Sequence, residues 1–288
     1  MKESLPISKI FSILNVLSLE INKETQLCIS IAARPGNFGA TVHNAAFKAS
    51  GLNYCYIPIG VKNVEDALTG LRAFNIKGCG VSMPHKERVI SLLDEVDSEA
   101  LQVGAVNTIV NTEGVLKGYN TDVYGVSVVL EEARVPASIT ALVVGAGGIA
   151  KAIITALKKR GIQRIIAANR TSEKALQLAR QFSIKSMDFS KINQIPAKLL
   201  VNATSVGMVP DEKDCIFKVN QIKKAEFVMD VPTNPMETQL CKLAQSLGPQ
   251  TIPGYLISLH QAARQFELYT GLSAPLEEMR SSLIKLIQ

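Results

Sequence analysis

Two residues of opposite charge follow predicted strands and could together carry out acid–base chemistry. Lys86 lies four residues beyond Ser82, and Asp122 ends the run of residues 118–122, Gly-Tyr-Asn-Thr-Asp. Ligands in open α/β sheets bind at the carboxyl ends of strands, so polar side chains placed there are candidate site residues. Taken singly, Lys86 could be a solvated lysine in the first turn of a helix, and Asp122 an N-terminal helix carboxylate.

As a pair, Lys86 and Asp122 suit a hydride-transfer site. Reduction of a ketone requires a proton at oxygen as hydride reaches carbon. A lysine ammonium can donate that proton, and a neighbouring carboxylate orients the lysine and keeps it charged. The other candidate proton donors are His43, His85 and His260, of which His85 is interpreted as a surface neighbour of Lys86. No two of these histidines have metal-ligand spacing, so we predict no metal.

A glycine-rich turn predicts a nucleotide site in the second half of the chain. Residues 140–144 form an apolar, β-branched strand pattern, and the turn after it matches the dinucleotide fingerprint with alanine in the third position. An amphipathic helix and a second strand, residues 164–168, follow in the required order. The turn residues predicted to bind the cofactor are Gly145, Ala146, Gly147, Gly148 and Ile149.

The end of the second strand indicates which dinucleotide binds. An NAD site usually has an acidic residue there, whereas this chain has Asn169, Arg170 and Thr171. Guanidinium, amide and hydroxyl groups can all hydrogen-bond a ribose 2′-phosphate, which a carboxylate would repel. The sequence therefore predicts NADP; the alternative is a solvated arginine in a strand-to-helix loop.

Strand and helix patterns alternate along the first 120 residues. We expect strands at 27–31, 53–57 and 77–82, a hairpin at 106–110 and 115–119, and helices from 43 to about 51, over 64–74 and over 87–96. A polar turn at 33–39 follows the first strand, and a helix at 123–133 leads to the nucleotide unit. This order predicts an N-terminal α/β domain with a mixed sheet.

The second half predicts a Rossmann-type domain with a parallel sheet. Further strands are expected at 199–202, 226–230 and 251–252, with helices at 173–182, 255–270 and 276–287. We expect the last two helices to return to the first domain. The predicted division is residues 1–122 with 253–288 as substrate domain and 123–252 as NADP-binding domain, with a cleft between them.

Composition excludes several classes of protein. The 288 residues carry a net charge of +6 without a dense basic block, so nucleic acid is not an expected partner. No apolar run approaches the length of a membrane span, and residues 1–24 are interpreted as a short amphipathic extension rather than a signal peptide. The five cysteines form no CxxC pair and suit reduced thiols in the cytoplasm. The expected partner is a small anionic molecule, and the chain is expected to be a monomer or homodimer.

Seven motifs in order resemble the shikimate dehydrogenase family from about residue 27 to the end. They comprise residues 81–86, 104–108, 118–122, the glycine turn, 169–171, 202–208 and the helix containing Gln261. The resemblance implies a two-lobed enzyme that reversibly reduces 3-dehydroshikimate to shikimate with NADPH. It assigns Lys86 and Asp122 as the catalytic pair.

The resemblance also assigns binding residues. Asn107 and Gln261 would hydrogen-bond substrate hydroxyls, and Asn37, Gly39 and Ser82 occupy the other substrate-binding positions. The remaining cofactor-binding positions are Thr204, Ser205, Val206, Gly207, Met208, Val231 and Gly254.

Several positions depart from the family pattern. The family usually has two serines that hold the substrate carboxylate, where this chain has Asn37 and Gly39. The usual asparagine two residues before Ser82 is Gly80, and the usual tyrosine of a Tyr-Asn-Pro motif is Thr233. Loss of two hydrogen bonds to a carboxylate would lower affinity on the order of 10²- to 10⁴-fold. These changes favour a shikimate-dehydrogenase-like branch with altered carboxylate recognition.

The sequence supports one principal function and two alternatives. The principal one is an NADP-dependent oxidoreductase acting on shikimate or a closely related cyclic hydroxy acid. One alternative is a dehydrogenase that prefers another such acid, for example quinate. The other is a catalytically weak NADPH-binding regulatory protein, favoured by the changes at Asn37, Gly39, Gly80 and Thr233.

Overall fold

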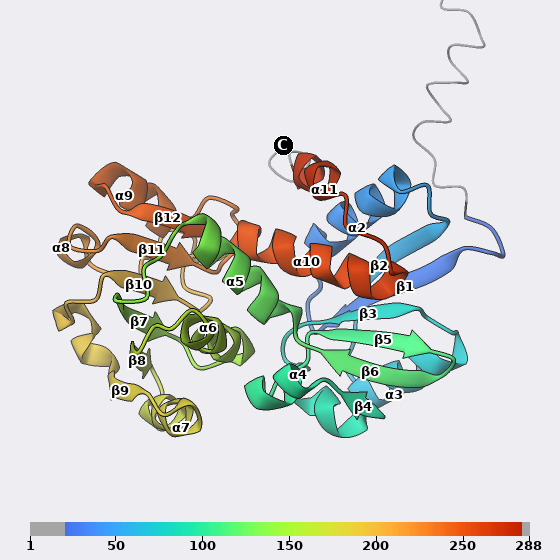
Figure 1. Cartoon of the computed structure of the whole chain (residues 1–288), viewed down its shortest axis with the longest axis horizontal. Helices are drawn as coiled ribbons and strands as arrows, with labels where there is room; N and C mark the ends of the chain where they lie inside the picture. The colour runs from blue at the N-terminus through green and yellow to red at the C-terminus, as the bar shows by residue number, and fades with distance from the viewer. Residues whose placement is uncertain (1–20, 284–288) are drawn as a thin grey trace, which may run out of the picture.

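The chain folds into two α/β lobes that lie side by side (Figure 1). The structure is a computed structural model and describes residues 21–283. One lobe is built on a six-stranded mixed sheet and the other on a six-stranded parallel sheet. The predicted fold class is therefore confirmed. The extension predicted for residues 1–24 lies, apart from 21–24, outside the described residues.

The carboxyl ends of the parallel strands β1, β2 and β3 lie at the same end of the mixed sheet, next to the start of β5. The strand order of this sheet is β2-β1-β3-β5-β6-β4. Strands β1, β2 and β3 are parallel, whereas the β5–β6 hairpin joins antiparallel to β3, so Thr108 at the start of β5 pairs with Gly80 near the end of β3. The bounds are Gln26–Ala32 (β1), Tyr54–Gly60 (β2), Gly78–Val81 (β3), Glu95–Val96 (β4), Thr108–Thr112 (β5) and Val115–Tyr119 (β6).

Helices cover both faces of the mixed sheet. Alternate residues of β1 point to opposite faces, so Ile29 packs in a cluster with α3 and Cys28 in a cluster with α2, α10 and α11. The helices of this lobe are α2 (Phe38–Ala49), α3 (Val64–Ala73), the 3₁₀ helix η1 (Arg88–Leu92), α4 (Ser98–Val103), α10 (Gly254–Thr270) and α11 (Leu276–Ser282).

The parallel sheet has the order β12-β11-β10-β7-β8-β9. Its central strands have apolar residues at successive positions because both faces are covered: Val143 faces the cluster that holds α5, α6 and α7, and Leu142 faces the cluster that holds α8 and α9. The strands are Thr140–Val144 (β7), Arg164–Asn169 (β8), Lys185–Asp188 (β9), Leu199–Asn202 (β10), Phe227–Asp230 (β11) and Gln250–Pro253 (β12). The helices are α5 (Thr121–Glu132), α6 (Gly148–Lys159), α7 (Ser172–Phe182), the 3₁₀ helix η2 (Phe189–Gln194), α8 (Val219–Ile222) and α9 (Gln239–Leu247).

Helices α5 and α10 join the lobes. They lie side by side at the centre of the molecule (Figure 1), and α10 begins directly after β12 and continues across the mixed sheet. Gly125 allows this close approach, because a Cβ there would lie 2.5 Å from the carbonyl oxygen of Ile257. No helix among residues 21–283 is long and apolar enough to cross a bilayer.

Two predicted helices differ in the structure. The helix expected over residues 87–96 is only the short η1, because Leu93 is extended and the Asp94 N–H donates to Leu116 O, which starts β4. The helix expected from His43 begins earlier, at Phe38, and takes in the end of the turn predicted at 33–39. The last predicted helix is described only as far as Ser282.

Substitution of Gly125 by alanine tests the α5–α10 contact. The added Cβ would also lie 3.0 Å from the Gln261 backbone nitrogen, so two backbones must separate. We expect Gly125→Ala to lower the free energy of unfolding by about 1–3 kcal/mol or more. Gly70→Ala is the matched control: its nearest atom would be 3.9 Å away, in Phe74, so helix propensity predicts a gain of up to about 1 kcal/mol. Equal stability of the two variants in urea unfolding would contradict this packing.

Candidate active site

Lys86 and Asp122 meet between the turn that follows β3 and the start of α5. Lys86 follows the turn after β3, where the His85 N–H donates to Ser82 O and the Lys86 carbonyl accepts from Val106 N–H. Asp122 is in the first turn of α5, whose N-cap is Asn120. The Lys86 Nζ lies 2.5 Å from Asp122 Oδ2, and the two side chains are 17% and 8% exposed. Lys86 is therefore not a solvated lysine, whereas Asp122 is a carboxylate at the N-terminus of a helix, as its alternative interpretation stated, and also the partner of Lys86.

Asn107 fixes the other oxygen of Asp122. Its Nδ2 donates to Asp122 Oδ1 at 2.8 Å, while its Oδ1 accepts from the Thr121 N–H at 2.7 Å and the Thr108 hydroxyl at 2.8 Å. The two accepted bonds determine the orientation of the amide. Asn107 is 2% exposed, so this arrangement is shielded from water.

Helix α10 contributes two glutamines to the same network. Gln261 Oε1 lies 3.3 Å from both Asn107 Nδ2 and Thr121 Oγ1. One turn later, the Gln265 Nε2 donates to Thr108 Oγ1 at 2.9 Å. Gln265 was not among the predicted site residues, because a single glutamine in an amphipathic helix carries no distinctive signal.

His43 lies behind this network and is fully buried. Its Nε2 is 3.2 Å from Gln265 Oε1, so Nε2 carries the proton, and Nδ1 has no partner among the described residues. Burial lowers the pKa of His43 from 6.5 to about 4, partly offset by the bond to Gln265. His43 is therefore neutral at pH 7, and a chain of hydrogen bonds through Gln265, Thr108 and Asn107 links it to Asp122.

The other two histidines lie apart from the pair. His85 was predicted to be a surface residue, but it is 7% exposed and its Nε2 lies 3.2 Å from the Val61 carbonyl. His85 is buried because the turn after β3 directs Lys86 toward Asp122 and directs His85 into the lobe. His260 is also buried, 3.5 Å from Glu132.

The remaining predicted substrate residues lie around the same sheet edge. Asn37 occupies the N-cap position of α2 but is exposed and makes no side-chain capping bond. Gly39 is in the first turn of α2 and is partly exposed. Ser82 follows β3 and is exposed.

The glycine turn lies directly against Lys86. Gly145 has a φ of +126°, and a Cβ there would be 2.5 Å from Ala203 O, so the turn and the end of β10 require glycine. A Cβ on Gly147 would meet nothing within 4 Å, and a Cβ on Gly148 would lie 3.5 Å from Lys86 Cδ. The start of α6 is thus an open cradle with backbone N–H groups, which suits a pyrophosphate. Ala146 and Ile149, also predicted, belong to the same turn and are partly exposed.

A second loop lies at the same edge of the parallel sheet. Asn202 organises it: its Oδ1 accepts from Thr204 N–H at 3.1 Å and its Nδ2 donates to Val206 O at 3.0 Å and to Asp230 Oδ1 at 2.7 Å. Burial raises the pKa of Asp230 to about 6, and the bonds from Thr238 and Asn202 oppose that shift. The predicted cofactor residues Thr204, Ser205, Val206, Gly207, Met208, Val231 and Gly254 follow the ends of β10, β11 and β12.

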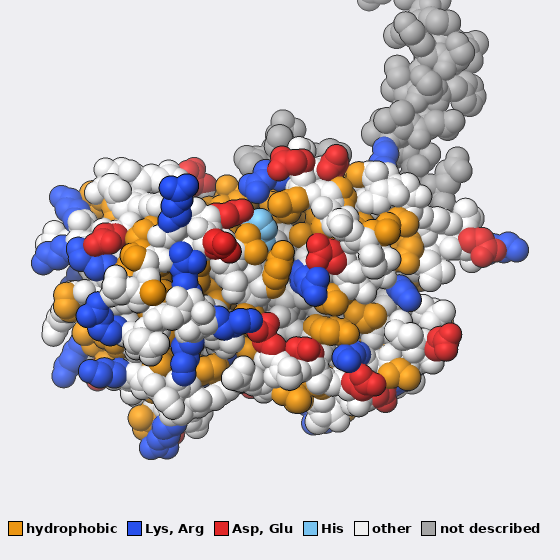
Figure 2. Space-filling model, in the orientation of Figure 1, with side chains coloured by type: hydrophobic (Ala, Val, Ile, Leu, Met, Phe, Trp, Pro, Cys, Tyr) orange, Lys and Arg blue, Asp and Glu red, His pale blue; other side chains and the backbone are white. Residues whose placement is uncertain are grey.

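The residues predicted to select the dinucleotide follow β8. Asn169 Nδ2 donates to Thr171 O at 3.1 Å, and Arg170 and Thr171 are exposed. Lys and Arg side chains gather over this lobe in Figure 2. Positive charge here would attract an anionic ligand.

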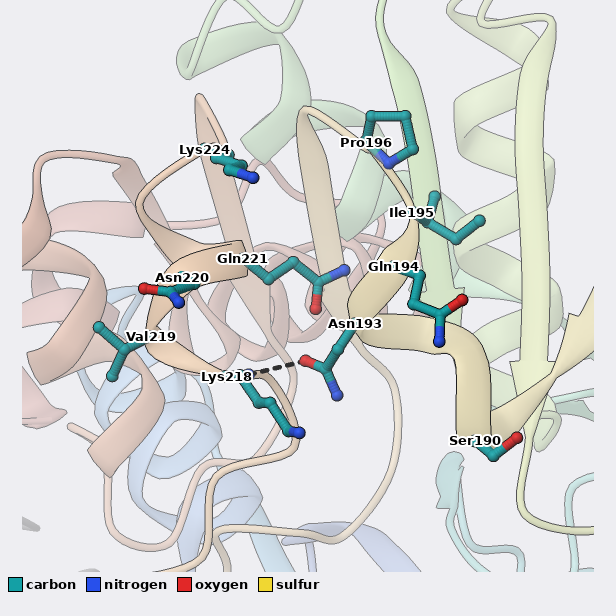
Figure 3. Close-up of a pocket in the computed structure, with 10 residues that line it drawn as sticks. All are labelled: Ser190, Asn193, Gln194, Ile195, Pro196, Lys218, Val219, Asn220, Gln221 and Lys224. Atoms are coloured by element: carbon teal, nitrogen blue, oxygen red, sulfur yellow. Dashed lines mark hydrogen bonds between the residues drawn. The ribbon is translucent and has the colours of Figure 1, made fainter.

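A cavity of about 560 Å³ opens elsewhere, between η2 and α8 (Figure 3). Asn193, Lys218 and Gln221 are among its lining residues, and the Lys218 N–H donates to Asn193 Oδ1. None of its lining residues is a predicted site residue. The chemistry of Lys86 and Asp122 therefore does not involve this cavity.

Models of one family match most of the chain. The substrate-binding domain of shikimate dehydrogenase matches residues 38–109, shikimate/quinate 5-dehydrogenase matches 130–235, and the C-terminal domain of shikimate 5′-dehydrogenase matches 257–284. The chain belongs to the shikimate dehydrogenase family.

Relatives and solved structures agree with this assignment. A shikimate dehydrogenase-like protein of Haemophilus influenzae is 39% identical over 252 residues, which cover 87% of this chain and 92% of the relative. A crystal structure of a shikimate dehydrogenase with NADP⁺ has a TM-score of 0.87 at 34% identity, covering 94% of this chain and 99% of the other. Quinate dehydrogenase of Corynebacterium glutamicum, solved with NAD, has a TM-score of 0.83 at 31% identity, covering 91% and 99%. The predicted family and its like-branch are confirmed.

The buried His43 predicts a specific pH dependence of stability. Because its pKa is about 4 when folded and 6.5 ordinarily, the unfolded chain binds this proton first as pH falls. We expect the lowered pKa of His43 to contribute about 3 kcal/mol to the free energy of unfolding above pH 6.5. This contribution should be lost progressively as the pH falls toward 4. Asp230, with its raised pKa, acts in the opposite direction over an overlapping range, so a single profile would mix the two.

The measurement is therefore a difference. Urea unfolding of the parent and of His43→Gln at intervals from pH 7.5 to pH 4 isolates the histidine, because Asp230 is common to both. We expect the parent's advantage over the variant to shrink as pH falls through this range. A difference in the free energy of unfolding that does not change with pH would show that folding leaves the pKa of His43 unchanged.

Proposed function

We propose that this protein reversibly reduces 3-dehydroshikimate to shikimate, or a closely related cyclic hydroxy acid, using NADPH. The observation that carries the proposal is the ion pair of Lys86 and Asp122, 2.5 Å apart, with the Lys86 side chain against the glycine turn. Lys86 of the mixed-sheet lobe, with its partner Asp122 at the start of α5, is thus adjacent to the dinucleotide cradle of the parallel-sheet lobe. Its relatives named as NADP-dependent shikimate dehydrogenases support the same cofactor.

In this mechanism Lys86 is the proton donor during reduction. Its ammonium donates to the carbonyl oxygen of the substrate, and in the oxidation direction the amine accepts the hydroxyl proton. Asp122 holds the ammonium in place through Oδ2, and Asn107 holds Asp122 through Oδ1. The bound cofactor supplies the hydride, which requires the carbonyl carbon to face the nicotinamide.

Cofactor binding is assigned to three segments of the parallel-sheet lobe. The glycine turn would receive the pyrophosphate through backbone N–H groups, and the loop 202–208 would line the nicotinamide side. Arg170, with Asn169 and Thr171, would hydrogen-bond the 2′-phosphate. We also propose the predicted domain division, in which residues 123–252 form the NADP-binding domain.

On the substrate side, Asn107 and Gln261 offer amide groups next to Asp122. We assign each a hydrogen bond to a ring hydroxyl, made in addition to or in exchange for its present partners: Asp122, Thr108, Thr121 and Gln261 for Asn107, and Asn107, Thr121 and the Ser258 carbonyl for Gln261. Ser82, Asn37 and Gly39 border the same edge. The substrate is therefore placed between α10 and the edge formed by β3 and β5.

Replacing Lys86 tests its catalytic role. Lys86→Met keeps an unbranched side chain, one atom shorter, and removes the amine that accepts the hydroxyl proton, so we expect kcat for shikimate oxidation to fall at least about 10²-fold. The dissociation constant of NADPH should change little. Lys117→Met removes another lysine ion pair of the same lobe, with Glu95 at 3.0 Å, and should leave kcat unchanged. A loss of less than tenfold in Lys86→Met would contradict the proposed role.

Replacing Arg170 tests the choice of cofactor. Arg170→Ala should weaken NADP binding by about 10- to 100-fold, the loss of a charge-assisted contact, while NAD binding stays nearly unchanged. Arg180→Ala, at the other end of α7, is the control for loss of positive charge. Calorimetric titration of both cofactors gives the comparison, and equal weakening of NADP and NAD would mean that Arg170 does not contact the phosphate.

The regulatory alternative remains distinguishable. It is favoured by the glycines at 39 and 80, where the family usually has polar side chains. A protein of this kind would bind NADPH tightly and turn over no cyclic hydroxy acid, including quinate. Steady-state assays of the parent against a panel of such acids separate it from the proposed enzyme.

A further inference from the structure

The side chain of Tyr56 fills the space beside two glycines at the substrate edge. A Cβ on Gly80 would lie 2.7 Å from the Tyr56 hydroxyl oxygen, which is shorter than the contacts that Cβ atoms make in proteins. A Cβ on Gly39 would lie 3.1 Å from the Tyr56 ring and 3.3 Å from its oxygen. The phenol therefore takes the room that side chains at positions 39 and 80 would need.

The space between Tyr56, Gly39 and Gly80 adjoins the hydrogen-bond network that holds Lys86 and Asp122. The same Cβ on Gly80 would be 3.5 Å from Gln265 Nε2, which donates to Thr108 and to the carbonyl of Asn107. Ser30 on β1 pairs with Gly80 in the sheet. Ser30 and Gly39, which flank the Tyr56 hydroxyl, are partly exposed, whereas Tyr56 itself is 3% exposed, so a ligand would reach the phenol past these two residues.

Tyr56 is held in one orientation. Its ring stacks on His43 with centroids 4.4 Å apart and an interplanar angle of 12°. Asn44 binds both backbone groups of Tyr56: its Oδ1 accepts from the N–H at 2.8 Å and its Nδ2 donates to the carbonyl at 3.0 Å. A donor fixed in this way loses little conformational entropy when it binds a ligand.

The phenol is equipped to donate a hydrogen bond. Ser30 is hydrogen-bonded to the Tyr56 oxygen, which favours the phenolate, but burial outweighs this and raises the pKa of Tyr56 well above its ordinary value. The hydroxyl therefore keeps its proton at all physiological pH values. With the Ser30 hydroxyl donating to the phenol oxygen, the phenol proton is left for another acceptor.

We propose that the Tyr56 hydroxyl binds the substrate carboxylate, in place of the side chains absent at positions 39 and 80. This inference rests on the proposed function for the identity of the substrate. A hydrogen bond from a neutral donor to a carboxylate is charge-assisted and so stronger than one to a hydroxyl. Tyr56 is thus a specificity-determining residue that distinguishes an acid from a neutral polyol.

The test measures binding in a complex that cannot turn over. Shikimate is titrated calorimetrically into the NADPH complex of the parent, Tyr56→Phe and Tyr54→Phe. Tyr54→Phe is the matched control, since it removes a phenol from the same strand where the ring packs on Phe47. We expect Tyr56→Phe to raise the dissociation constant about 10- to 100-fold and Tyr54→Phe to change it less than about threefold.

A neutral ligand supplies the specificity readout. The neutral ligand is the analogue of shikimate in which the carboxylate is reduced to hydroxymethyl. Tyr56→Phe should raise the dissociation constant of this analogue by a factor at least about threefold smaller than the factor for shikimate. An unchanged constant for shikimate in Tyr56→Phe, an equal loss in Tyr54→Phe, or no binding by the parent would overturn the inference. Tyr56-dependent binding without hydride transfer would instead overturn the proposed function alone.

A double-mutant cycle tests the geometry. Gly80→Ala in the parent must displace the phenol oxygen and should weaken shikimate binding, whereas in Tyr56→Phe the conflicting oxygen is absent and the alanine should cost nothing further. Additive losses would mean that Tyr56 and position 80 do not share this space, and would overturn the assignment.

Discussion

The rest of the structure depends on one desolvated ion pair. Lys86 and Asp122 are 36 residues apart in the chain, yet their side chains meet at 2.5 Å with little access to water. An isolated charge in such a place is strongly unfavourable, and removing one partner of a buried pair typically costs about 3–5 kcal/mol. Asn107 offsets part of that cost by binding the second carboxylate oxygen, and Thr108 and Thr121 in turn hold Asn107.

Contacts between the lobes bring this pair to the glycine turn. Lys151 of α6 forms an ion pair with Glu87, directly after Lys86, at 2.7 Å, and Gln181 of α7 donates to the Val103 carbonyl at 3.3 Å. The α5–α10 contact lies beside them and carries Gln261 and Gln265 into the site. The elements proposed to bind the cofactor and the substrate therefore meet at these contacts, so small shifts there would alter the distance between Lys86 and the glycine turn.

The sequence predicted the parts of the site that follow from strand ends and turn chemistry. Lys86, Asp122 and the glycine turn all come within five residues of the end of a strand, and within each sheet the carboxyl ends of parallel strands lie together. Tyr56 could not be found in this way, because a tyrosine in an apolar strand is an ordinary core residue and its contact with Gly39 and Gly80 exists only in three dimensions. His43 was a candidate proton donor by residue type, but its burial behind Gln265 could not be predicted from an amphipathic helix pattern. His85 was assigned to the surface for a related reason: residue type and spacing do not determine which way a turn directs each of two adjacent side chains.

The most direct test of the acid–base role is a crystal structure of the protein with NADP and shikimate bound together. We predict that Lys86 Nζ lies within about 3 Å of the ring hydroxyl whose carbon faces the nicotinamide C4, with Asp122 still bound to the lysine. A complex in which that hydroxyl contacts neither Lys86 nor Asp122, or in which shikimate binds away from the glycine turn, would contradict the account.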